Sequence, residues 1–119
     1  MKNKKVTITK DRIFYSDGIK NKGIVMDKIA KPLTEEFCNV VGKGGGHILD
    51  IGFGLGYSAN RFYSMDVKSY TCIEINKQIY DTAIEWAKDK DNVEIIFGDW
   101  IDVIPTLSKK FDGIFMDTY

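Results

Sequence analysis

The sequence predicts an α/β protein built on a short parallel sheet of about four strands. From residue 47 onward, short apolar runs typical of buried strands alternate with segments of helical periodicity. The first apolar run, residues 47–51, leads directly into a loop with glycine at positions 52, 54 and 56. An acidic residue stands at or next to the end of each predicted strand. Because such alternation implies right-handed crossovers, we expect a ligand site at the carboxyl ends of the strands.

The composition is that of one globular domain spanning residues 1–119, with 44% hydrophobic and 29% charged residues. Its 17 basic and 17 acidic residues cancel, so no overall field favours nucleic acid or an anionic membrane, although residues 2–5 are locally basic. No stretch approaches the roughly 20 apolar residues of a membrane span, and the start has no signal-peptide core. Cys38 and Cys72 lie in apolar surroundings, and His47 is the only histidine. We therefore expect buried free thiols, no metal site and a cytoplasmic location.

The amino-terminal arm, residues 1–23, is predicted to form a small hairpin or an extended segment. Residues 6–9 and 12–16 are β-prone and are separated by a short polar pair. Residues 24–41 have apolar side chains at helical spacing, which predicts a helix that Pro32 kinks or divides. The side chains of its apolar stripe are Val25, Ile29, Leu33, Phe37, Val40 and Val41.

The rest of the core, up to residue 119, reads as strands and helices in turn. Strands are expected at residues 47–51, 70–75, 93–97 and 111–116. Helices are expected at residues 57–65, from an N-cap at Asn76 to near Lys90, and over a short segment that ends at Leu107.

The spacing of the glycines indicates which kind of nucleotide loop this is. A dinucleotide fingerprint, Gly-x-Gly-x-x-Gly, requires glycine at position 57, where Tyr57 is too large for close contact between helix and strand. The spacing found is Asp50-x-Gly52-x-Gly54-x-Gly56. It resembles the first motif of the class I S-adenosylmethionine-dependent methyltransferases, although a glycine loop alone also fits a generic tight turn or another nucleotide fold. The resemblance implies a Rossmann-like three-layer fold, with S-adenosylmethionine as cofactor and S-adenosylhomocysteine as product.

The acids that follow the glycine loop fit the parts of this cofactor. Glu74 stands eighteen residues after Gly56, where a carboxylate can accept hydrogen bonds from the ribose hydroxyl pair; the alternative is a solvated acid at the edge of a strand. The resemblance places adenine recognition at Asp99 and Trp100, but Asp99 also suits a helix cap and Trp100 a core position. Asp50 is expected either to bind loop amides or, as in the family, to help hold the methionine end of the cofactor. The expected cofactor-binding residues are Asp50, Gly52, Phe53, Gly54, Gly56, Glu74, Ile75, Asp99, Trp100 and Asp117.

Two segments in the second half of the chain point to one group within the class I methyltransferases. Residues 98–107 read Gly-Asp-Trp-Ile-Asp-Val-Ile-Pro-Thr-Leu, and the last strand ends in Asp117-Thr118-Tyr119. Both segments are similar to the guanidinoacetate N-methyltransferase group, and the similarity runs from about Val25 to Tyr119. In that family the aspartate of the final motif holds the acceptor nitrogen and takes up its proton, which implies Asp117 as the catalytic residue.

Two departures distinguish this chain from that group. The family clasps its guanidinium with a second acid in the helix before the first strand, and Ala30 stands at that place. The alternatives for this role, on neighbouring turns, are Asp27, Glu35 and Glu36. Family members also continue through three further strands, so we expect a sheet truncated relative to the seven-stranded methyltransferase fold. In the inferred strand order third, second, first, fourth, residues 111–116 form an open apolar edge. We therefore expect a homodimer or a higher homo-oligomer that covers this edge.

The function that follows is a minimal methyltransferase acting on a nitrogen or oxygen nucleophile, with a small-molecule acceptor favoured. Three alternatives stay open. One is a non-catalytic module that binds or senses S-adenosylmethionine or serves as a partner subunit. The second is an enzyme that consumes S-adenosylmethionine without a separate acceptor, and the third is a nucleic-acid methyltransferase. A nucleotide-dependent oxidoreductase is least favoured because of Tyr57.

Overall fold

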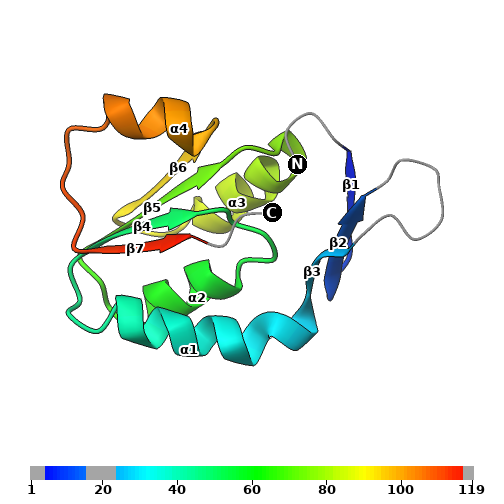
Figure 1. Cartoon of the computed structure of the whole chain (residues 1–119), viewed down its shortest axis with the longest axis horizontal. Coiled ribbons are helices and arrows are strands. Elements are labelled where there is room, and N and C mark those ends of the chain that lie inside the picture. Colours follow the sequence, from blue (N-terminus) through cyan, green and yellow to red (C-terminus); the bar gives the residue numbers. More distant parts are fainter. Residues whose placement is uncertain (1–4, 16–23, 117–119) are drawn as a thin grey trace.

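The computed structural model of this chain describes residues 5–15 and 24–116 (Figure 1). Its larger sheet contains β4 (His47–Ile51), β5 (Ser69–Glu74), β6 (Val93–Phe97) and β7 (Gly113–Met116). All neighbouring strands in this sheet run parallel, in the order β6-β5-β4-β7. The expected fold class and the order third, second, first, fourth are therefore confirmed.

Alternate residues of the central strand face two apolar layers. On β4, Ile48 belongs to one cluster of buried side chains, whereas Leu49 and Ile51 belong to the other. The register sets Ile51 opposite Ile73 of β5 on one side and opposite Met116 of β7 on the other. The carboxyl ends of these strands therefore lie side by side.

Helices cover both faces of the larger sheet and complete a three-layer arrangement (Figure 1). Their bounds are α1 (Lys31–Val41), α2 (Tyr57–Ser64), α3 (Lys77–Ala87), α4 (Trp100–Val103) and the 3-10 turn η2 (Ile104–Thr106). The first three helices share a buried cluster that includes Phe62 and Ile79. The segment of α4 and η2 packs on the other face, against Leu49 and Ile73. Within residues 24–116, no helix is long and apolar enough to cross a membrane.

A small antiparallel sheet precedes the first helix. It contains β1 (Val6–Ile8), β2 (Arg12–Tyr15) and β3 (Ile24–Asp27), in the order β1-β2-β3. Of the two forms expected for residues 6–16, the hairpin is present in β1 and β2. The helix expected from residue 24 is wrong over its first four residues, which form β3. After the 3-10 turn η1 (Lys28–Ala30), α1 begins with Pro32 in its first turn. Proline is tolerated there because a first-turn N–H has no partner within the helix, so Pro32 marks the start of α1 and not a kink.

The apolar stripe expected on α1 faces away from the core. The exposed members of this stripe are Ile29, Leu33, Phe37 and Val40. The residues that α1 buries are Thr34 and Cys38. Helical spacing shows which side chains share a face, but it does not show which face meets the core.

The edge strand of the larger sheet, β7, packs closely against α1 and leaves apolar side chains exposed. A Cβ atom on Gly113 would lie 2.7 Å from the Val41 carbonyl oxygen, so glycine allows α1 and β7 to approach this closely. On β7, Ile114 and Met116 are 55% and 49% exposed. This edge of the described sheet is therefore open and apolar, as the sequence predicts.

Candidate functional site

The glycine loop begins where β4 ends, at the carboxyl edge of the larger sheet (Figure 1). Its three glycines have positive φ, at 97° for Gly52, 56° for Gly54 and 84° for Gly56. Side chains of L residues disfavour this conformation, so the backbone itself requires glycine at alternate positions. The Gly52 N–H donates to the Ile73 carbonyl oxygen over 2.9 Å, which keeps the start of the loop attached to β5.

Phe53 anchors the loop from inside. Its side chain is 5% exposed, and its ring meets the edge of Trp86 on α3 with ring centroids 5.6 Å apart. Its backbone N–H donates to Glu74 Oε1 over 2.7 Å. Phe53 was predicted to bind the cofactor; the structure shows that its ring faces the core, so only its main chain is placed for such a contact.

Glu74 is the last residue of β5 and is 2% exposed. While Oε1 accepts from the loop at Phe53, Oε2 accepts from the backbone N–H of Asn76 over 2.9 Å. Each carboxylate oxygen has more than one acceptor site, so both can accept a further hydrogen bond from a ligand. The structure thus joins Glu74 to the glycine loop and is inconsistent with a solvated surface acid.

Asn76 starts α3 directly beside this carboxylate. Its Oδ1 accepts from the backbone N–H groups of Gln78 over 3.0 Å and Ile79 over 3.2 Å. The predicted N-cap is therefore confirmed.

Asp50 supports the loop from beneath and has no exposed surface. Its Oδ2 accepts hydrogen bonds from Ser58 Oγ over 2.6 Å and from Tyr70 Oη over 2.5 Å. Ser58 lies in the first turn of α2 and Tyr70 lies in β5, so one carboxylate ties together the elements on both sides of the glycine loop. Neither hydroxyl partner was predicted, because no short motif signals a contact between residues eight and twenty positions apart.

The surroundings of Asp50 keep two nearby groups protonated. Burial and the Asp50 charge raise the pKa of the Tyr70 hydroxyl well above its ordinary value. The same two causes raise the pKa of the Cys72 thiol. Tyr70 is therefore a hydrogen-bond donor at neutral pH, and Cys72 is not a reactive thiolate. Cys38 and Cys72 are both buried thiols outside any disulfide, as expected. Within the described ranges, no cluster of His, Cys, Asp and Glu side chains could hold a metal ion.

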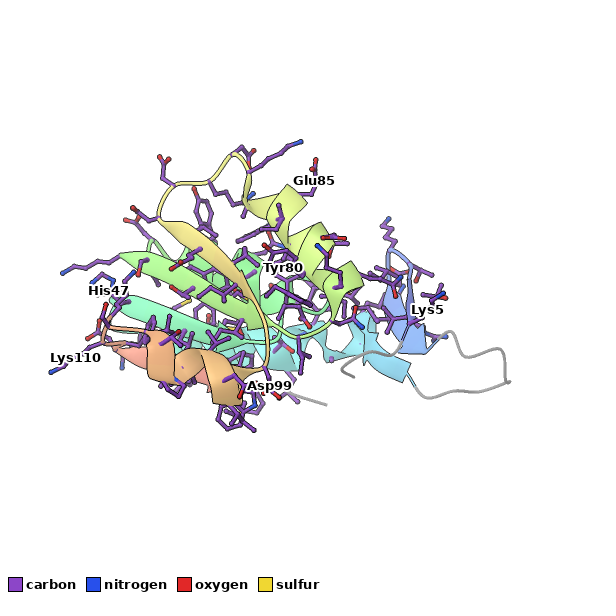
Figure 2. All side chains as sticks on the ribbon, turned by 90° about the horizontal axis from the view of Figure 1, so that it is seen from above. Lys5, His47, Tyr80, Glu85, Asp99 and Lys110 are labelled. Carbon is purple, nitrogen blue, oxygen red and sulfur yellow. The ribbon has the colours of Figure 1, made fainter. Side chains whose placement is uncertain are left out.

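Asp99 and Trp100 follow β6 at the same edge of the sheet. The Gly98 N–H donates to the Glu74 carbonyl oxygen over 3.0 Å, which holds the ends of β5 and β6 together. Asp99 Oδ1 accepts from the Ile101 N–H over 3.1 Å, so its predicted role as a helix cap is confirmed. Trp100 is 36% exposed, and the alternative of a core position is wrong. Figure 2 shows Asp99 at this end of the larger sheet.

The structure gathers most of the predicted site at one edge. The half-buried Ile75 follows Glu74 directly, and the glycine loop and Asp99 lie at the ends of the flanking strands. Asp117, the predicted catalytic residue, lies outside the described residues. Ala30, where the family has its second acid, ends η1 and is half-buried.

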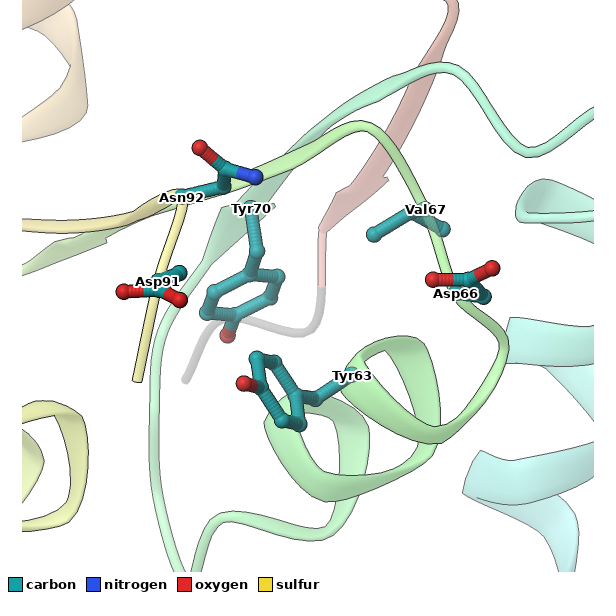
Figure 3. Close-up of a pocket in the computed structure, with 6 residues that line it drawn as sticks. All are labelled: Tyr63, Asp66, Val67, Tyr70, Asp91 and Asn92. Atoms are coloured by element: carbon teal, nitrogen blue, oxygen red, sulfur yellow. The ribbon is translucent and has the colours of Figure 1, made fainter. Parts of the chain in front are cut away.

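A separate pocket of about 260 Å³ lies at the opposite edge of the sheet (Figure 3). It is lined by Tyr63, Asp66, Val67, Tyr70, Asp91 and Asn92. Tyr70 lies near the start of β5, and Asn92 directly precedes β6, so the pocket is at the amino ends of these strands. It contains neither the glycine loop nor the acids of the strand ends, and it is therefore distinct from the predicted ligand site.

The chain is similar to known methyltransferases in sequence profile and in fold. A family profile described as guanidinoacetate N-methyltransferase matches residues 17–119. Similar solved structures include the O-methyltransferase TomG of Streptomyces achromogenes, solved with S-adenosylmethionine, at TM-score 0.61 and 24% identity over 73% of this chain and 44% of that one. An O-methyltransferase of Bacillus cereus, solved with S-adenosylhomocysteine, gives TM-score 0.59 and 25% identity over 73% and 44%. The S-adenosylhomocysteine-bound methyltransferase PaMTH1 of Podospora anserina gives TM-score 0.60 and 22% identity over 77% and 41%.

The three solved structures show that the chain has the same fold as part of each protein. The chain shares its three-layer arrangement with all three solved proteins. It spans 41–44% of their length, so the matched part of each solved protein is less than half of that protein.

Proposed function

This chain belongs to the guanidinoacetate N-methyltransferase family, and on that premise we propose that it binds S-adenosylmethionine and transfers its methyl group to a nitrogen or oxygen nucleophile. A small-molecule acceptor is favoured over nucleic acid, because basic and acidic residues are equal in number. The solved neighbours that hold S-adenosylmethionine or S-adenosylhomocysteine support this choice of cofactor.

The observation that carries the proposal is the position of the Glu74 carboxylate against the glycine loop. A ribose offers two neighbouring hydroxyl groups, and a fixed carboxylate accepts from both. The bonds from Phe53 and Asn76 hold Glu74 in place before any ligand binds. The loop that it meets has positive-φ glycines, where main chain and ligand can come into close contact. The residues present therefore fit the nucleoside part of the cofactor.

The remaining parts of the cofactor are assigned to neighbouring residues. Asp99 would accept from the adenine amino group, while Ile75 and Trp100 would pack on the ring. Asp99 Oδ1 already caps α4, so the adenine contact would fall to Oδ2. Asp50 is fully buried beneath the loop, and its role would be to hold the loop and not to touch the ligand.

The chemistry requires little from the protein. When bound, the cofactor supplies a sulfonium-activated methyl group that is already a strong electrophile. The chain must align the acceptor, exclude water and accept one proton. We assign the last role to Asp117, which follows β7 directly, because Met116 of that strand pairs with Ile51 beside the glycine loop. Ala30 provides no second carboxylate, so an acceptor with a single amine group is favoured over guanidinoacetate.

A non-catalytic binding role is the second candidate, favoured by the alanine at position 30. Product analysis separates the possibilities. S-Adenosylhomocysteine that appears only with an added acceptor indicates methyl transfer. Other breakdown products that form without an acceptor indicate consumption of the cofactor, and binding with no product indicates a sensing or partner role.

The test of the proposal is calorimetric titration with S-adenosylmethionine and S-adenosylhomocysteine. Glu74→Ala should weaken binding tenfold or more, which corresponds to about 1.4 kcal/mol. The matched control is Glu94→Gln, because Glu94 is an exposed acid on the neighbouring strand β6. Thermal melts of all proteins exclude unfolding as the cause. Equal affinities for the wild type and a folded Glu74→Ala protein would contradict the proposed site.

A further inference from the structure

The β1–β3 sheet lies beyond the carboxyl ends of β4, β5 and β7 (Figure 1). In Figure 2, Lys5 at the start of this small sheet and His47 at the start of β4 lie at opposite ends of the molecule. Val6 and Ile13 of the small sheet are 3% and 0% exposed, and they belong to the same apolar cluster as Phe53 of the glycine loop. The small sheet therefore packs against the core at the end of the molecule where the proposed ligand site lies.

One side chain of α3, that of Gln78, holds the small sheet through two hydrogen bonds. Gln78 Nε2 donates to the Val6 carbonyl oxygen over 2.9 Å, and Gln78 Oε1 accepts from the Val6 N–H over 2.8 Å. Val6 belongs to β1, an edge strand of the small sheet. The Gln78 amide therefore takes the place that a peptide group of a further strand would occupy. Two opposed bonds to one residue fix both the distance and the orientation of β1 relative to α3.

The same side chain stands close to the proposed ribose acid. Asn76 Oδ1 accepts from the Gln78 N–H over 3.0 Å, and the Asn76 N–H donates to Glu74 Oε2 over 2.9 Å. Glu74 in turn accepts from Phe53 in the glycine loop. A continuous series of hydrogen bonds therefore joins Val6 to the glycine loop through the first turn of α3.

We propose that Gln78 is a positioning residue that couples the seating of the β1–β3 sheet to occupation of the cofactor site. The inference rests on the proposed function, because it takes Glu74 as the residue that holds the ligand. A ligand bound to Glu74 restrains Asn76 and the first turn of α3. It thereby also restrains the Gln78 side-chain amide, which bonds to the Val6 backbone. Coupling of two equilibria is reciprocal. The seated sheet therefore strengthens ligand binding, and the bound ligand slows the opening of β1.

Three variants test this coupling. Gln78→Ala removes both bonds. Gln78→Glu at neutral pH can still accept from the Val6 N–H but faces the Val6 carbonyl oxygen without a proton to donate. Below the ordinary glutamate pKa of about 4.3 its carboxyl group is neutral, and both bonds can form again. The matched control is Thr82→Ala, because the Thr82 hydroxyl donates to the Ile79 carbonyl oxygen of its own helix and, among the described residues, makes no bond to the small sheet.

Two readouts are needed: hydrogen exchange of the Val6 amide and calorimetric affinity for S-adenosylhomocysteine. In the wild type, the ligand should slow exchange at Val6. In Gln78→Ala, exchange should be about tenfold faster and the dissociation constant about three- to tenfold higher, because two neutral hydrogen bonds are lost. Gln78→Glu should resemble Gln78→Ala at pH 7, and its exchange should return toward the wild-type rate measured at pH 4. Thr82→Ala should match the wild type in both readouts.

Two results would overturn the coupling. Unchanged exchange at Val6 in Gln78→Ala would show that the amide does not hold β1. Faster exchange with an unchanged dissociation constant would show that Gln78 holds the small sheet without any effect on the ligand site. Failure of the proposed function has a different signature: a folded wild type would not bind S-adenosylhomocysteine at all, while Gln78→Ala would still speed exchange at Val6.

Discussion

Substitution of Gly56 by alanine has the most explicit consequence in this structure. Gly56 has a φ of 84°, and a Cβ atom placed on it would lie 3.1 Å from Phe53 Cζ and 3.2 Å from Cε2. The alanine must adopt a left-handed backbone and also displace the Phe53 ring. That ring already meets Trp86, with ring centroids 5.6 Å apart, so it has little freedom to move.

The magnitude follows from these two effects. A left-handed backbone costs an L residue about 1–2 kcal/mol, and overpacking of a buried ring costs about 1–3 kcal/mol. The lower entropy of an alanine in the unfolded chain offsets about 0.4–1 kcal/mol. We therefore expect Gly56→Ala to lower the free energy of unfolding by about 1–5 kcal/mol, with a midpoint of about 3 kcal/mol, a large part of the stability of a small domain.

Alanine substitutions at two other glycines, measured by urea unfolding, separate the backbone strain from the contact with the Phe53 ring. Gly45 has a φ of 70° with nothing within 4 Å of its added Cβ, so Gly45→Ala measures backbone strain alone, about 1 kcal/mol. Gly44 also has open space and lies outside the positive-φ region, so Gly44→Ala should be neutral or stabilising by up to about 1 kcal/mol. If Gly56→Ala were no worse than Gly45→Ala, the contact between the loop and the Phe53 ring would not have the predicted effect.

Three further predictions concern other parts of the molecule. Tyr70→Phe should cost about 1–3 kcal/mol because it removes one of the two hydroxyl donors to Asp50. Since the raised Tyr70 pKa lets the folded state keep a proton that the unfolded state loses, wild-type stability should fall as pH rises past about 10. Urea unfolding across alkaline pH should show a smaller fall in the variant; an equal fall would rule out Tyr70 as its source. Asp99→Ala should cost about 1 kcal/mol of stability through the lost α4 cap and should also weaken binding of S-adenosylhomocysteine in calorimetry; an unchanged affinity would leave Asp99 with the capping role alone. We also propose that the open edge of β7 and the exposed stripe of α1 pair with a second copy of the chain. Sedimentation should then show a homodimer that Phe37→Glu dissociates, whereas a wild type that stays monomeric at every concentration would contradict the pairing.

The sequence predicts the larger sheet well because its signals are local. Each strand is a short apolar run between turn residues, and the alternate glycines correspond to three positive-φ positions. The N-caps at Asn76 and Asp99 are also recognisable, because a capping side chain acts within three residues of its own position. The strand order third, second, first, fourth was also inferred correctly, on the expectation of right-handed crossovers.

The errors and omissions have physical causes. The apolar spacing of residues 24–41 does not reveal that the first four form a strand or that Leu33 and Phe37 face outward. The two hydrogen bonds between Val6 and Gln78 join residues 72 positions apart, and only the folded chain brings them together. The contact of Tyr70 with Asp50 is similarly beyond the range of any sequence motif. Long-range polar contacts were therefore the part of the site that sequence patterns could not supply.

The most direct test of the account is an amide chemical-shift titration of the nitrogen-15-labelled protein with S-adenosylhomocysteine. We predict that the largest shifts occur in the glycine loop, residues 52–56, at Glu74 to Asn76 and at Asp99, all at the carboxyl edge of the sheet. Shifts confined to the pocket of Tyr63 and Asp91 at the opposite edge, or no shifts in a folded protein, would contradict a cofactor site formed by the glycine loop and Glu74.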